Sequence, residues 1–285
     1  MLISLRHKFI FVANEKTGST SLEAALCNYS DINIVRTEWG KHSHLAAIER
    51  QFGWIFDVIP KEEFLIFGVV REPFDWLASQ YHSHQDQKFA RYGHEYAGDM
   101  TSDEFIEIWC DRNPKSSVPQ NQRFLSATGE IGTNFLIKFE NMNEQFDLVA
   151  RYLELPQIFL PRINASPQHA RPFNPGPASL RLIRERYALD YGLHHSAGRF
   201  VGSAETRGAL AQQAAPRPVS QGSSPPRLSE DEVVWGYRII LGRDPESRRV
   251  VEEHRAHASL EVLRNVLLAS REYRMRKVGK DAPQG

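Results

Sequence analysis

The sequence predicts an α/β domain of about 200 residues followed by a smaller helical domain. Three short apolar runs, at residues 9–13, 64–70 and 135–139, have the length and composition of strands buried on both faces, and a helical pattern follows each run. The chain has 285 residues, more than one ordinary domain needs, and its pattern changes after residue 201. Together these observations predict alternating strands and helices with a second domain attached.

The composition is that of an ordinary globular protein. Hydrophobic residues make up 41% of the chain and charged residues 25%, and 35 basic residues balance 35 acidic ones. This balance gives no indication of a nucleic-acid partner. The N-terminus lacks the apolar core of a signal peptide, and no run approaches the roughly 18 consecutive apolar residues of a membrane-spanning helix. We therefore expect a cytoplasmic protein without a transmembrane segment.

The first apolar run leads directly into a polar loop and then into a helix. Residues 9–13 form the predicted strand, residues 14–20 read Asn-Glu-Lys-Thr-Gly-Ser-Thr, and apolar residues at helical spacing begin at Leu22. A loop rich in Gly, Ser and Thr at a helix start leaves backbone N–H groups and the positive end of the helix dipole available for an anion. The candidate residues for binding a phosphate or sulfonate group are Lys16, Thr17, Gly18, Ser19, Thr20 and Ser21.

An ATP-binding P-loop is the first function to test against this loop. Such a loop has the pattern G-x-x-x-x-G-K-S/T, with the lysine directly after the second glycine. In this chain Lys16 precedes Gly18, so the pattern is absent. From the residues alone, a phosphate-binding loop of another kind and a purely structural turn both remain open.

Two histidines lie between the first helix and the next one. His42 and His44 come just before residues 45–52, whose apolar residues have helical spacing. This position predicts that both histidines lie near the end of the sheet. A His-x-His pair also has the spacing of metal ligands, but no cysteine or nearby carboxylate pair completes a site, so we predict no metal. Ordinary surface histidines are the alternative.

The second apolar run ends in an arginine at a helix start. Residues 64–70 form the predicted strand, Arg71 follows, and Pro73 fits the first turn of a helix. Ser79 lies on that helix, away from its apolar face. An arginine fork and a serine hydroxyl together suit a terminal phosphate, which needs bidentate donors more than a single charge. We therefore predict a second anion-binding element at Arg71 and Ser79.

The rest of the first domain continues the alternation of strand and helix. The predicted elements are a helix over 101–110, a strand over 135–139, and helices over 145–153 and 180–190. A capping box at Thr101 and Glu104 opens the first of these helices. The stretches 82–100 and 113–130 are predicted loops, and neither has a pattern that identifies an acceptor molecule.

The C-terminal part of the chain changes in character. Residues 201–228 are rich in Ala, Gln, Pro, Ser and Gly without apolar periodicity, which predicts a flexible linker after a first domain at 1–200. A second capping box, at Ser229 and Glu232, opens a small all-α domain at 229–278. Its three expected helices cover about 230–241, 245–256 and 259–276. Some fifty residues form a marginal core, so this domain is expected to lean on the first domain or on a partner.

Several of these stretches resemble the sulfotransferases that use 3′-phosphoadenosine-5′-phosphosulfate (PAPS). KTGSTS at 16–21 is similar to their 5′-phosphosulfate loop, and VVREPFDWLASQYH at 69–82 is similar to their 3′-phosphate-binding strand and helix. Three later segments of the family also have counterparts in this chain. They resemble FLIKFENMNEQF at 135–146, Asn-Ala-Ser at 164–166 and RERYALDYG at 184–192. The resemblance covers roughly residues 8 to 195 and is greatest to bacterial, carbohydrate-type members.

The resemblance implies a fold and a set of roles. The expected fold is a P-loop-like three-layer sandwich with a central parallel sheet, and PAPS would lie across the carboxyl ends of the strands. Residues 16–21 would hold the 5′-phosphosulfate, with Lys16 also catalytic, while Arg71 and Ser79 would hold the 3′-phosphate. The acceptor would be a hydroxyl of a carbohydrate or another molecule. His42 or His44 would be the general base, because Lys-His and His-x-His patterns occur in related sequences.

Two other classes of function stay open, and the second domain has its own resemblance. A nucleotide or small-molecule kinase with a variant phosphate loop should show a carboxylate for magnesium, which is not evident. A non-catalytic PAPS- or nucleotide-binding protein is the other alternative.

The second domain resembles a small bacterial helical domain of unknown function found on glycan-related proteins. The resemblance is carried by YRIILGRDPES at 237–247 and LLASREYR at 267–274. This domain is expected to recruit the acceptor or a protein partner.

Overall fold

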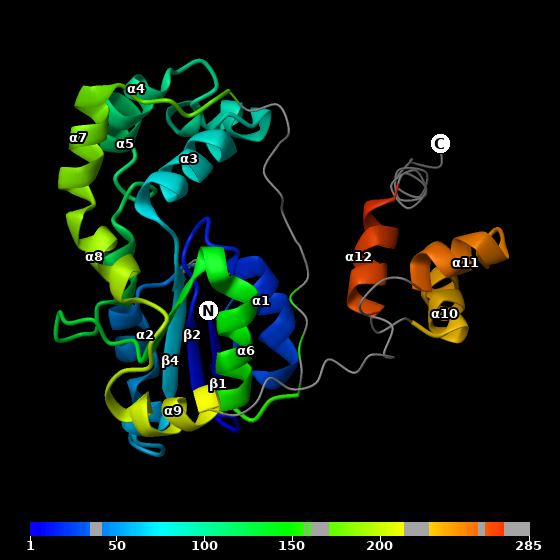
Figure 1. Cartoon of the computed structure of the whole chain (residues 1–285). Coiled ribbons are helices and arrows are strands. Elements are labelled where there is room, and N and C mark those ends of the chain that lie inside the picture. The colour runs from blue at the N-terminus through cyan, green and yellow to red at the C-terminus, as the bar shows by residue number, and fades with distance from the viewer. Residues whose placement is uncertain are drawn as a thin grey trace. The chain divides into compact units, whose positions relative to one another are not determined.

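The computed structural model describes residues 1–34, 42–156, 158, 160, 171–213, 228–255 and 260–270. The chain divides into two compact units, Met1–Ala215 (unit 1) and Pro216–Gly285 (unit 2). Each unit is described by itself. Unit 1 contains a sheet with helices around it, and the described part of unit 2 contains only helices (Figure 1).

The sheet of unit 1 has five strands in the order β3-β1-β2-β4-β5. Its strands are β1 (Leu2–Ser4), β2 (Phe9–Val12), β3 (Ile32–Asn33), β4 (Leu65–Val70) and β5 (Phe135–Lys138). The pairs β2–β4 and β4–β5 are parallel. The three strands predicted from apolar runs are therefore confirmed, and they lie side by side.

The predicted central parallel sheet is confirmed for β2, β4 and β5 but does not extend to β1. This strand pairs antiparallel with both β2 and β3, so the sheet is mixed. Only residues 5–8 connect β1 to β2, and parallel neighbours need a crossover of a dozen or more residues. The three residues of β1 are too few to carry a recognisable strand pattern.

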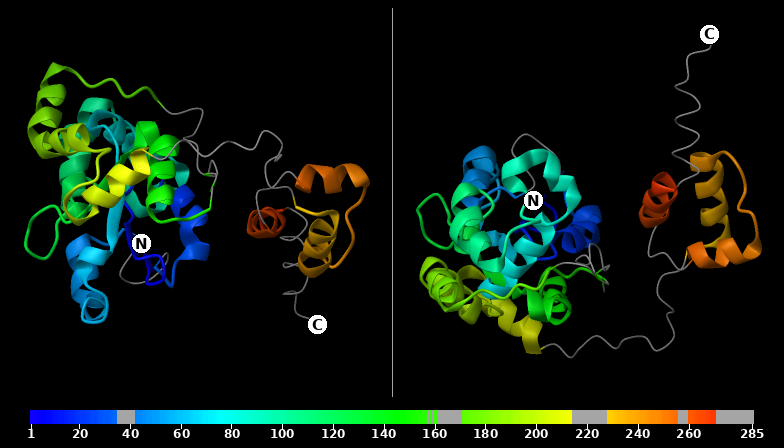
Figure 2. Two further views of the ribbon diagram at one scale, coloured as in Figure 1. Left: turned by 60° about the horizontal axis from the view of Figure 1, so that its bottom comes forward. Right: turned by 90° about the horizontal axis from the view of Figure 1, so that it is seen from above.

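Helices cover both faces of the sheet (Figures 1 and 2). One face carries α1 (Ser19–Leu26), α6 (Met142–Tyr152) and α9 (Glu205–Gln213). The other face carries α2 (Leu45–Phe52), the 3₁₀ turn η6 (Gln120–Phe124) and the end of α8 (Ala188–Ser196). Within β2, Phe9 and Phe11 contribute to the first core, and Ile10 and Val12 to the second. This period of two is what a strand buried on both faces requires.

A third apolar cluster involves α3 (Pro73–His84) and α7 (Pro177–Arg186). Between them in sequence, α4 (Ser102–Glu104), the π-helical η5 (Phe105–Trp109) and α5 (Cys110–Arg112) form one continuous helical segment. The capping box at Thr101 and Glu104 is present at its start. Trp76, Trp109 and Tyr187 are fully buried in this cluster. The cluster fixes α3, which follows β4 directly.

Six shorter turns complete unit 1. They are η1 (Cys27–Tyr29), η2 (Gly53–Ile55), η3 (Lys61–Glu63), η4 (Gln87–Glu95), η7 (Phe139–Asn141) and η8 (Gly202–Ala204). The stretch 82–100, predicted to be a loop, is therefore partly helical, because α3 extends to His84 and η4 follows. His84 is buried and its Nδ1 lies 2.9 Å from the carbonyl of Glu95, which anchors this stretch to α3.

The beginning of the expected linker is also helical. Phe200 stacks on Tyr152 and packs on Phe135, and α9 continues the chain across the same face of the sheet. The buried positions of α9 are Gly208 and Ala211. Small residues of this kind give little apolar signal, which is why the sequence pattern predicted a linker from residue 201. Residues 214–227 lie outside the described part of the chain.

Unit 2 has three described helices, α10 (Glu230–Leu241), α11 (Arg248–Arg255) and α12 (Leu260–Ala269). The capping box at Ser229 and Glu232 is present, and Gly242 ends α10 in the left-handed conformation with φ of 63°. The buried residues include Val233, Tyr237, Leu241, Val251, Leu263 and Leu267. In either unit, none of the described helices is both long enough and apolar enough to cross a membrane.

Candidate anion-binding site

The turn between β2 and α1 depends on a glycine. Gly18 has φ of 70°, and a Cβ atom there would lie 2.7 Å from the terminal methyl of Met142. Only glycine avoids both problems. Lys16 is also left-handed, with φ of 57°. Gly18 is the N-cap residue of α1 and offers no side chain to the first N–H groups of the helix. The helix therefore begins directly behind the end of a central strand with its positive end uncovered by a capping side chain.

The side chains of this loop have different environments. The Thr17 hydroxyl donates a hydrogen bond to the carbonyl of Asn14 at 3.0 Å, and Thr17 is fully buried, so this side chain closes the turn. Ser19 and Ser21 are buried, whereas Lys16 and Thr20 are partly exposed. The loop thus presents one lysine and one threonine at its surface, above a helix start lined by serines.

Arg71 brings the second anion-binding element against this loop. Its Nη1 donates to the carbonyl of Lys16 at 3.4 Å, and its guanidinium carbon lies 4.4 Å from the ring centre of Phe139. Burial lowers the pKa of Arg71 from its ordinary value, against the effect of Asp75 and Glu140. The Nε of Arg71 is buried and has no hydrogen-bond partner among the described residues. A buried donor without a partner normally indicates a site for an unseen polar group.

Two more residues of α3 lie on this side. Ser79 is buried about two turns into the helix, and its predicted role beside Arg71 stays a prediction. His82 follows one turn later. Burial lowers the pKa of His82, and the positive charges of Arg71 and Lys16 lower it further. His82 therefore lies within the electrostatic field of Arg71 and Lys16.

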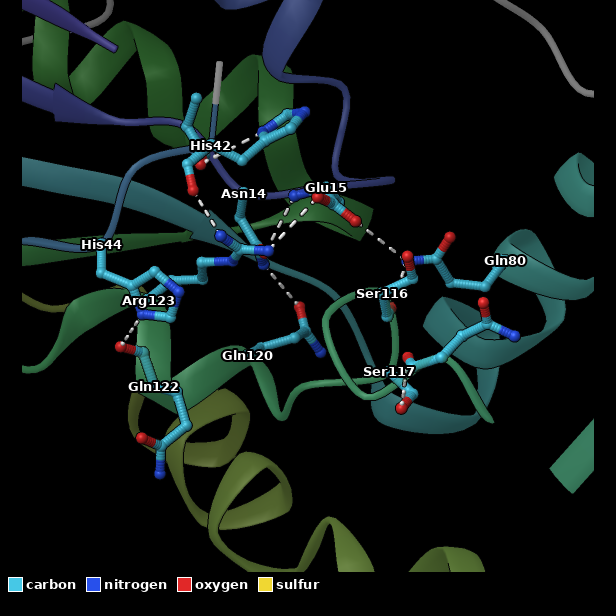
Figure 3. A network of polar contacts seen from close by, with 12 residues as sticks. Asn14, Glu15, His42, His44, Gln80, Ser116, Ser117, Gln120, Gln122 and Arg123 are labelled. Atoms are coloured by element: carbon cyan, nitrogen blue, oxygen red, sulfur yellow. Dashed lines mark hydrogen bonds and ion pairs between the residues drawn. The ribbon is translucent and has the colours of Figure 1, made fainter. Parts of the chain in front are cut away.

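A polar network ties the two elements together through Gln120. Figure 3 shows its contact with Asn14. The Gln120 Oε1 accepts hydrogen bonds from Asn14 Nδ2 and from the Arg71 N–H, both at 3.0 Å. Its Nε2 donates to the Arg71 carbonyl at 2.8 Å. One side chain thus joins the residues that follow β2 and β4.

Asp190 holds the same segment from the other side. Its two carboxylate oxygens accept the backbone N–H groups of Gln120 and Asn121 at 2.7 and 2.8 Å. Burial raises the pKa of Asp190 to about 6, although both of these hydrogen bonds favour its charged form. Asp190 is on α8, so this helix supports η6.

His42 lies at the end of β2. Its Nδ1 is 3.3 Å from the carbonyl of Ala13, the residue before the loop. The backbone carbonyl of His42 accepts a hydrogen bond from Nη1 of Arg123 (Figure 3). Arg123 is buried, and its Nη2 forms an ion pair with Glu15 at 3.2 Å. His42, Glu15 and Arg123 thus form a connected group beside Lys16.

His44 is the N-cap residue of α2, and its Nδ1 lies 2.9 Å from the carbonyl of Gln122. Burial lowers the pKa of His44, and the charge of Arg123 lowers it further, while Glu15 raises it. Because a carbonyl only accepts, Nδ1 carries the proton in His42 and in His44, and the lone pair of the neutral ring is then on Nε2. Both histidines predicted from the sequence therefore lie beside Arg123 (Figure 3).

The structure brings Arg71 against Lys16 and both histidines beside Arg123, and it adds three residues to this group that the sequence did not indicate. These are Gln120, Arg123 and Asp190. Within the described ranges, no group of three His, Cys, Asp or Glu side chains could hold a metal ion. Asn164 and Ser166 lie outside the described residues.

A separate cavity of about 580 Å³ lies beside the start of α3. Its lining residues are Glu72, Phe74, Leu180, Ile183, Arg184 and Tyr191. None of them belongs to the residues predicted to bind an anion. Burial and the neighbouring Glu72 raise the pKa of Tyr191. Glu72 directly follows Arg71 and affects its pKa, so the cavity lies next to the second anion-binding element.

Comparison with known families assigns residues 1–195 to the Sulfotransferase family. Comparison with curated proteins and with solved structures found no match. The matched range includes the loop at Lys16, both histidines, Arg71, and the segment from Gln120 to Arg123, and it spans more than half of the chain. The chain therefore belongs to the sulfotransferase family, and its expected chemistry is sulfuryl transfer.

Proposed function

We propose that this protein transfers a sulfuryl group from PAPS to a hydroxyl group of a carbohydrate. PAPS carries a 5′-phosphosulfate and a 3′-phosphate on the same ribose, so its site needs two anion-binding elements about a ribose apart. The contact between Arg71 and the carbonyl of Lys16 is the observation that supports this proposal most, because it joins two such elements. Residues 16–21 would bind the 5′-phosphosulfate, and Arg71 with Ser79 the 3′-phosphate.

The residues present fit such a donor. The buried Nε of Arg71 lacks a partner among the described residues, and an oxygen of a phosphate would supply one. The start of α1 has no capping side chain, and its dipole favours an anion. The positive field of Lys16 and Arg71 lowers the pKa of His82, and the same field favours a ligand with several negative charges. Ser79 adds a hydroxyl on the helix that Arg71 precedes.

PAPS, when bound, supplies an activated sulfuryl group whose leaving group is a phosphate oxygen. In the transfer, the acceptor oxygen forms a bond to sulfur while the bond from sulfur to the phosphate oxygen breaks. Lys16 and the N–H groups at the start of α1 stabilise the negative charge that grows on that oxygen. Because the 5′-phosphosulfate and the 3′-phosphate are both held, the donor is oriented so that the acceptor hydroxyl attacks sulfur in line with the leaving group.

A histidine removes the proton of the acceptor hydroxyl, and we assign this role to His42 in preference to His44. The Nδ1 of His42 is held by the carbonyl of Ala13, so Nε2 is the ring nitrogen that accepts the proton. His44 is held by Gln122, further from Lys16 in the network. Burial lowers the pKa of His44, which favours the neutral form of its ring, so His44 is the second candidate.

The remaining parts of the proposal concern the setting of the reaction. The three-layer arrangement around β2, β4 and β5 supports a P-loop-like sandwich, since the loop follows a central strand. We propose a cytoplasmic enzyme that needs no metal. Unit 2, with its three described helices, would recruit the acceptor or a protein partner. A kinase or a non-catalytic nucleotide-binding protein is the alternative that experiment must exclude.

Calorimetry tests the donor assignment directly. The desulfonated product 3′-phosphoadenosine 5′-phosphate (PAP) should bind the protein at least tenfold more tightly than AMP, because a charge-assisted contact to the additional phosphate contributes about 1.5–3 kcal/mol. Equal affinities would refute the assignment. Incubation with ³⁵S-labelled PAPS and a panel of oligosaccharides should then label an acceptor, whereas tight PAP binding without any labelled product would favour a binding protein.

A further inference from the structure

Gln120 connects the two anion-binding elements through a fully buried side chain, of which 1% is exposed. The side chain accepts one hydrogen bond from Asn14, which begins the loop, and exchanges two with the backbone of Arg71. Asn14 and Arg71 are the first polar residues after β2 and β4. This carboxamide therefore helps to set the positions of Lys16 and Arg71 relative to each other, together with the contacts of Asn14 with the Val69 carbonyl and of Arg71 with the Lys16 carbonyl.

The chemistry of these contacts requires an amide. The Oε1 of Gln120 accepts two N–H groups, and Nε2 donates to the Arg71 carbonyl. A carboxylate could accept the same two hydrogen bonds, but it would place an oxygen against that carbonyl. Asn14 is fixed in turn, because its Oδ1 accepts the N–H of Glu15 and its Nδ2 also approaches the carbonyl of Val69 at 3.3 Å.

The segment that carries Gln120 is held independently of the site. Phe124 lies against Gly68 in the middle of β4, where a Cβ atom would be 2.3 Å from the Phe124 ring. Asp190 accepts the N–H groups of Gln120 and Asn121. Both contacts prevent η6 from following a movement of the loop, so Gln120 has a rigid support.

We propose that Gln120 is a positioning residue that sets the separation between the loop at Lys16 and the guanidinium of Arg71. It thereby gives the site its preference for a nucleotide with phosphate groups on both the 3′ and the 5′ oxygen of its ribose. This inference rests on the proposed function, since it concerns the site for PAPS. A ligand held at two points gains affinity only when the spacing of the two points matches its own length.

The experiment compares three nucleotides on one variant. Calorimetry with PAP, AMP and adenosine 3′-phosphate measures binding to both elements and to each element alone. In Gln120→Glu, PAP should lose roughly tenfold in affinity, while the two monophosphates should each lose less than about threefold. The ratio of PAP affinity to AMP affinity should therefore fall. Gln51→Glu, the same change at an exposed position of α2, is the matched control and should leave the ratio unchanged.

The outcomes separate this inference from the function on which it rests. Equal binding of PAP and AMP by the wild-type protein would refute both. A normal preference in the wild type that persists in Gln120→Glu would overturn the inference alone, as would a parallel loss for all three nucleotides, which a general loss of structure produces. If Gln120→Glu does not fold, Gln120→Asn keeps the amide but shortens its reach, and the same fall in the ratio is expected. Thermal unfolding of each variant confirms that a folded protein is compared.

Discussion

The loop between β2 and α1 lies beside the turn η6, and the two regions differ in how their main polar groups are hydrogen-bonded. Around the loop, the N-cap Gly18 offers no side chain to α1, and the buried Nε of Arg71 has no partner among the described residues. In η6, the Gln120 amide makes three hydrogen bonds within the protein, and Arg123 is paired with Glu15, although the buried Oδ1 of Asn121 has no partner among the described residues. The pairing of Gln120 and Arg123 suits a supporting role, whereas the Nε of Arg71 keeps a donor for the proposed ligand.

This comparison predicts different consequences for the two kinds of residue. Removing a group that contacts the donor or acceptor should change turnover or affinity directly. Removing a support should change the geometry of the site and the stability of the fold. The following predictions run from the largest expected effect to the smallest.

The largest effect is expected at the base. His42→Ala should lower turnover by ~10²–10⁴-fold with an identified acceptor, because proton removal from the hydroxyl then falls to water. PAP affinity should stay nearly unchanged, since a base is needed for transfer and not for donor binding. Initial rates with labelled PAPS and calorimetry with PAP measure the two quantities.

The matched control for this prediction is His44→Ala, which removes the same ring from the other side of Arg123. If turnover falls in His44→Ala but not in His42→Ala, the general base is His44. A parallel fall in PAP affinity and turnover in His42→Ala would show that this histidine shapes the loop through the Ala13 carbonyl instead.

The next largest effect is expected at Arg71. Arg71→Ala should weaken PAP binding by roughly tenfold or more, since a charge-assisted contact to phosphate is lost. AMP should be affected less, because it lacks the 3′-phosphate. Arg71→Lys keeps the charge without the fork and should recover only part of the PAP affinity, which titration calorimetry can resolve. An equal loss for PAP and AMP would mean that Arg71 supports the loop through the Lys16 carbonyl.

The residues proposed to bind the ligand have local sequence patterns, whereas the residues that support them do not. Residues 16–21 and the pair Arg71 and Ser79 lie next to strand ends in short continuous patterns, so local chemistry identifies them. Gln120 meets Asn14 across 106 residues, and Arg123 meets Glu15 across 108. Nothing in the local sequence indicates such a contact, because it depends on the packing of η6 against β4.

The same reasoning applies to the fold. Strands β2, β4 and β5 are apolar runs and were predictable, but β1 has three residues and α9 buries only glycine and alanine. Their positions follow from tertiary packing on a core that the longer elements define. His42 and His44 were predictable as a pair near the sheet end, whereas their contacts with Arg123 and Gln122 were not.

A smaller effect is expected from the support at Asp190. Burial raises its pKa from 3.8 to about 6, so the folded protein binds this proton more tightly than the unfolded chain does. The stability that this carboxyl contributes is present below about pH 4 and is lost as the pH rises through about 6. Relative to Asp190→Asn, the free energy of unfolding of the wild type should fall by at most about 1.4 kcal/mol per pH unit in this window.

Urea unfolding of both proteins between pH 4 and 7 measures this difference. Above pH 7 the difference should be constant, because the carboxyl is ionised in both states. A difference that does not change with pH would mean that the folded and unfolded states share one pKa at Asp190, and that its hydrogen bonds to Gln120 and Asn121 offset its burial completely.

The smallest effect is expected from unit 2, and it depends on where the chain is cut. A protein ending at Ala215 should bind PAP with unchanged affinity, because every residue of the proposed donor site and all of α9 belong to unit 1. Ending the chain at Phe200 instead should destabilise the fold, since Ala204 and Ala211 are buried in the core that contains Phe200. Calorimetry and thermal unfolding of both truncations test this boundary.

The longer truncation also tests the role of unit 2. A large loss of PAP affinity would mean that unit 2 contributes to the donor site. Normal PAP binding with lost transfer to a macromolecular acceptor would instead assign unit 2 to acceptor recruitment.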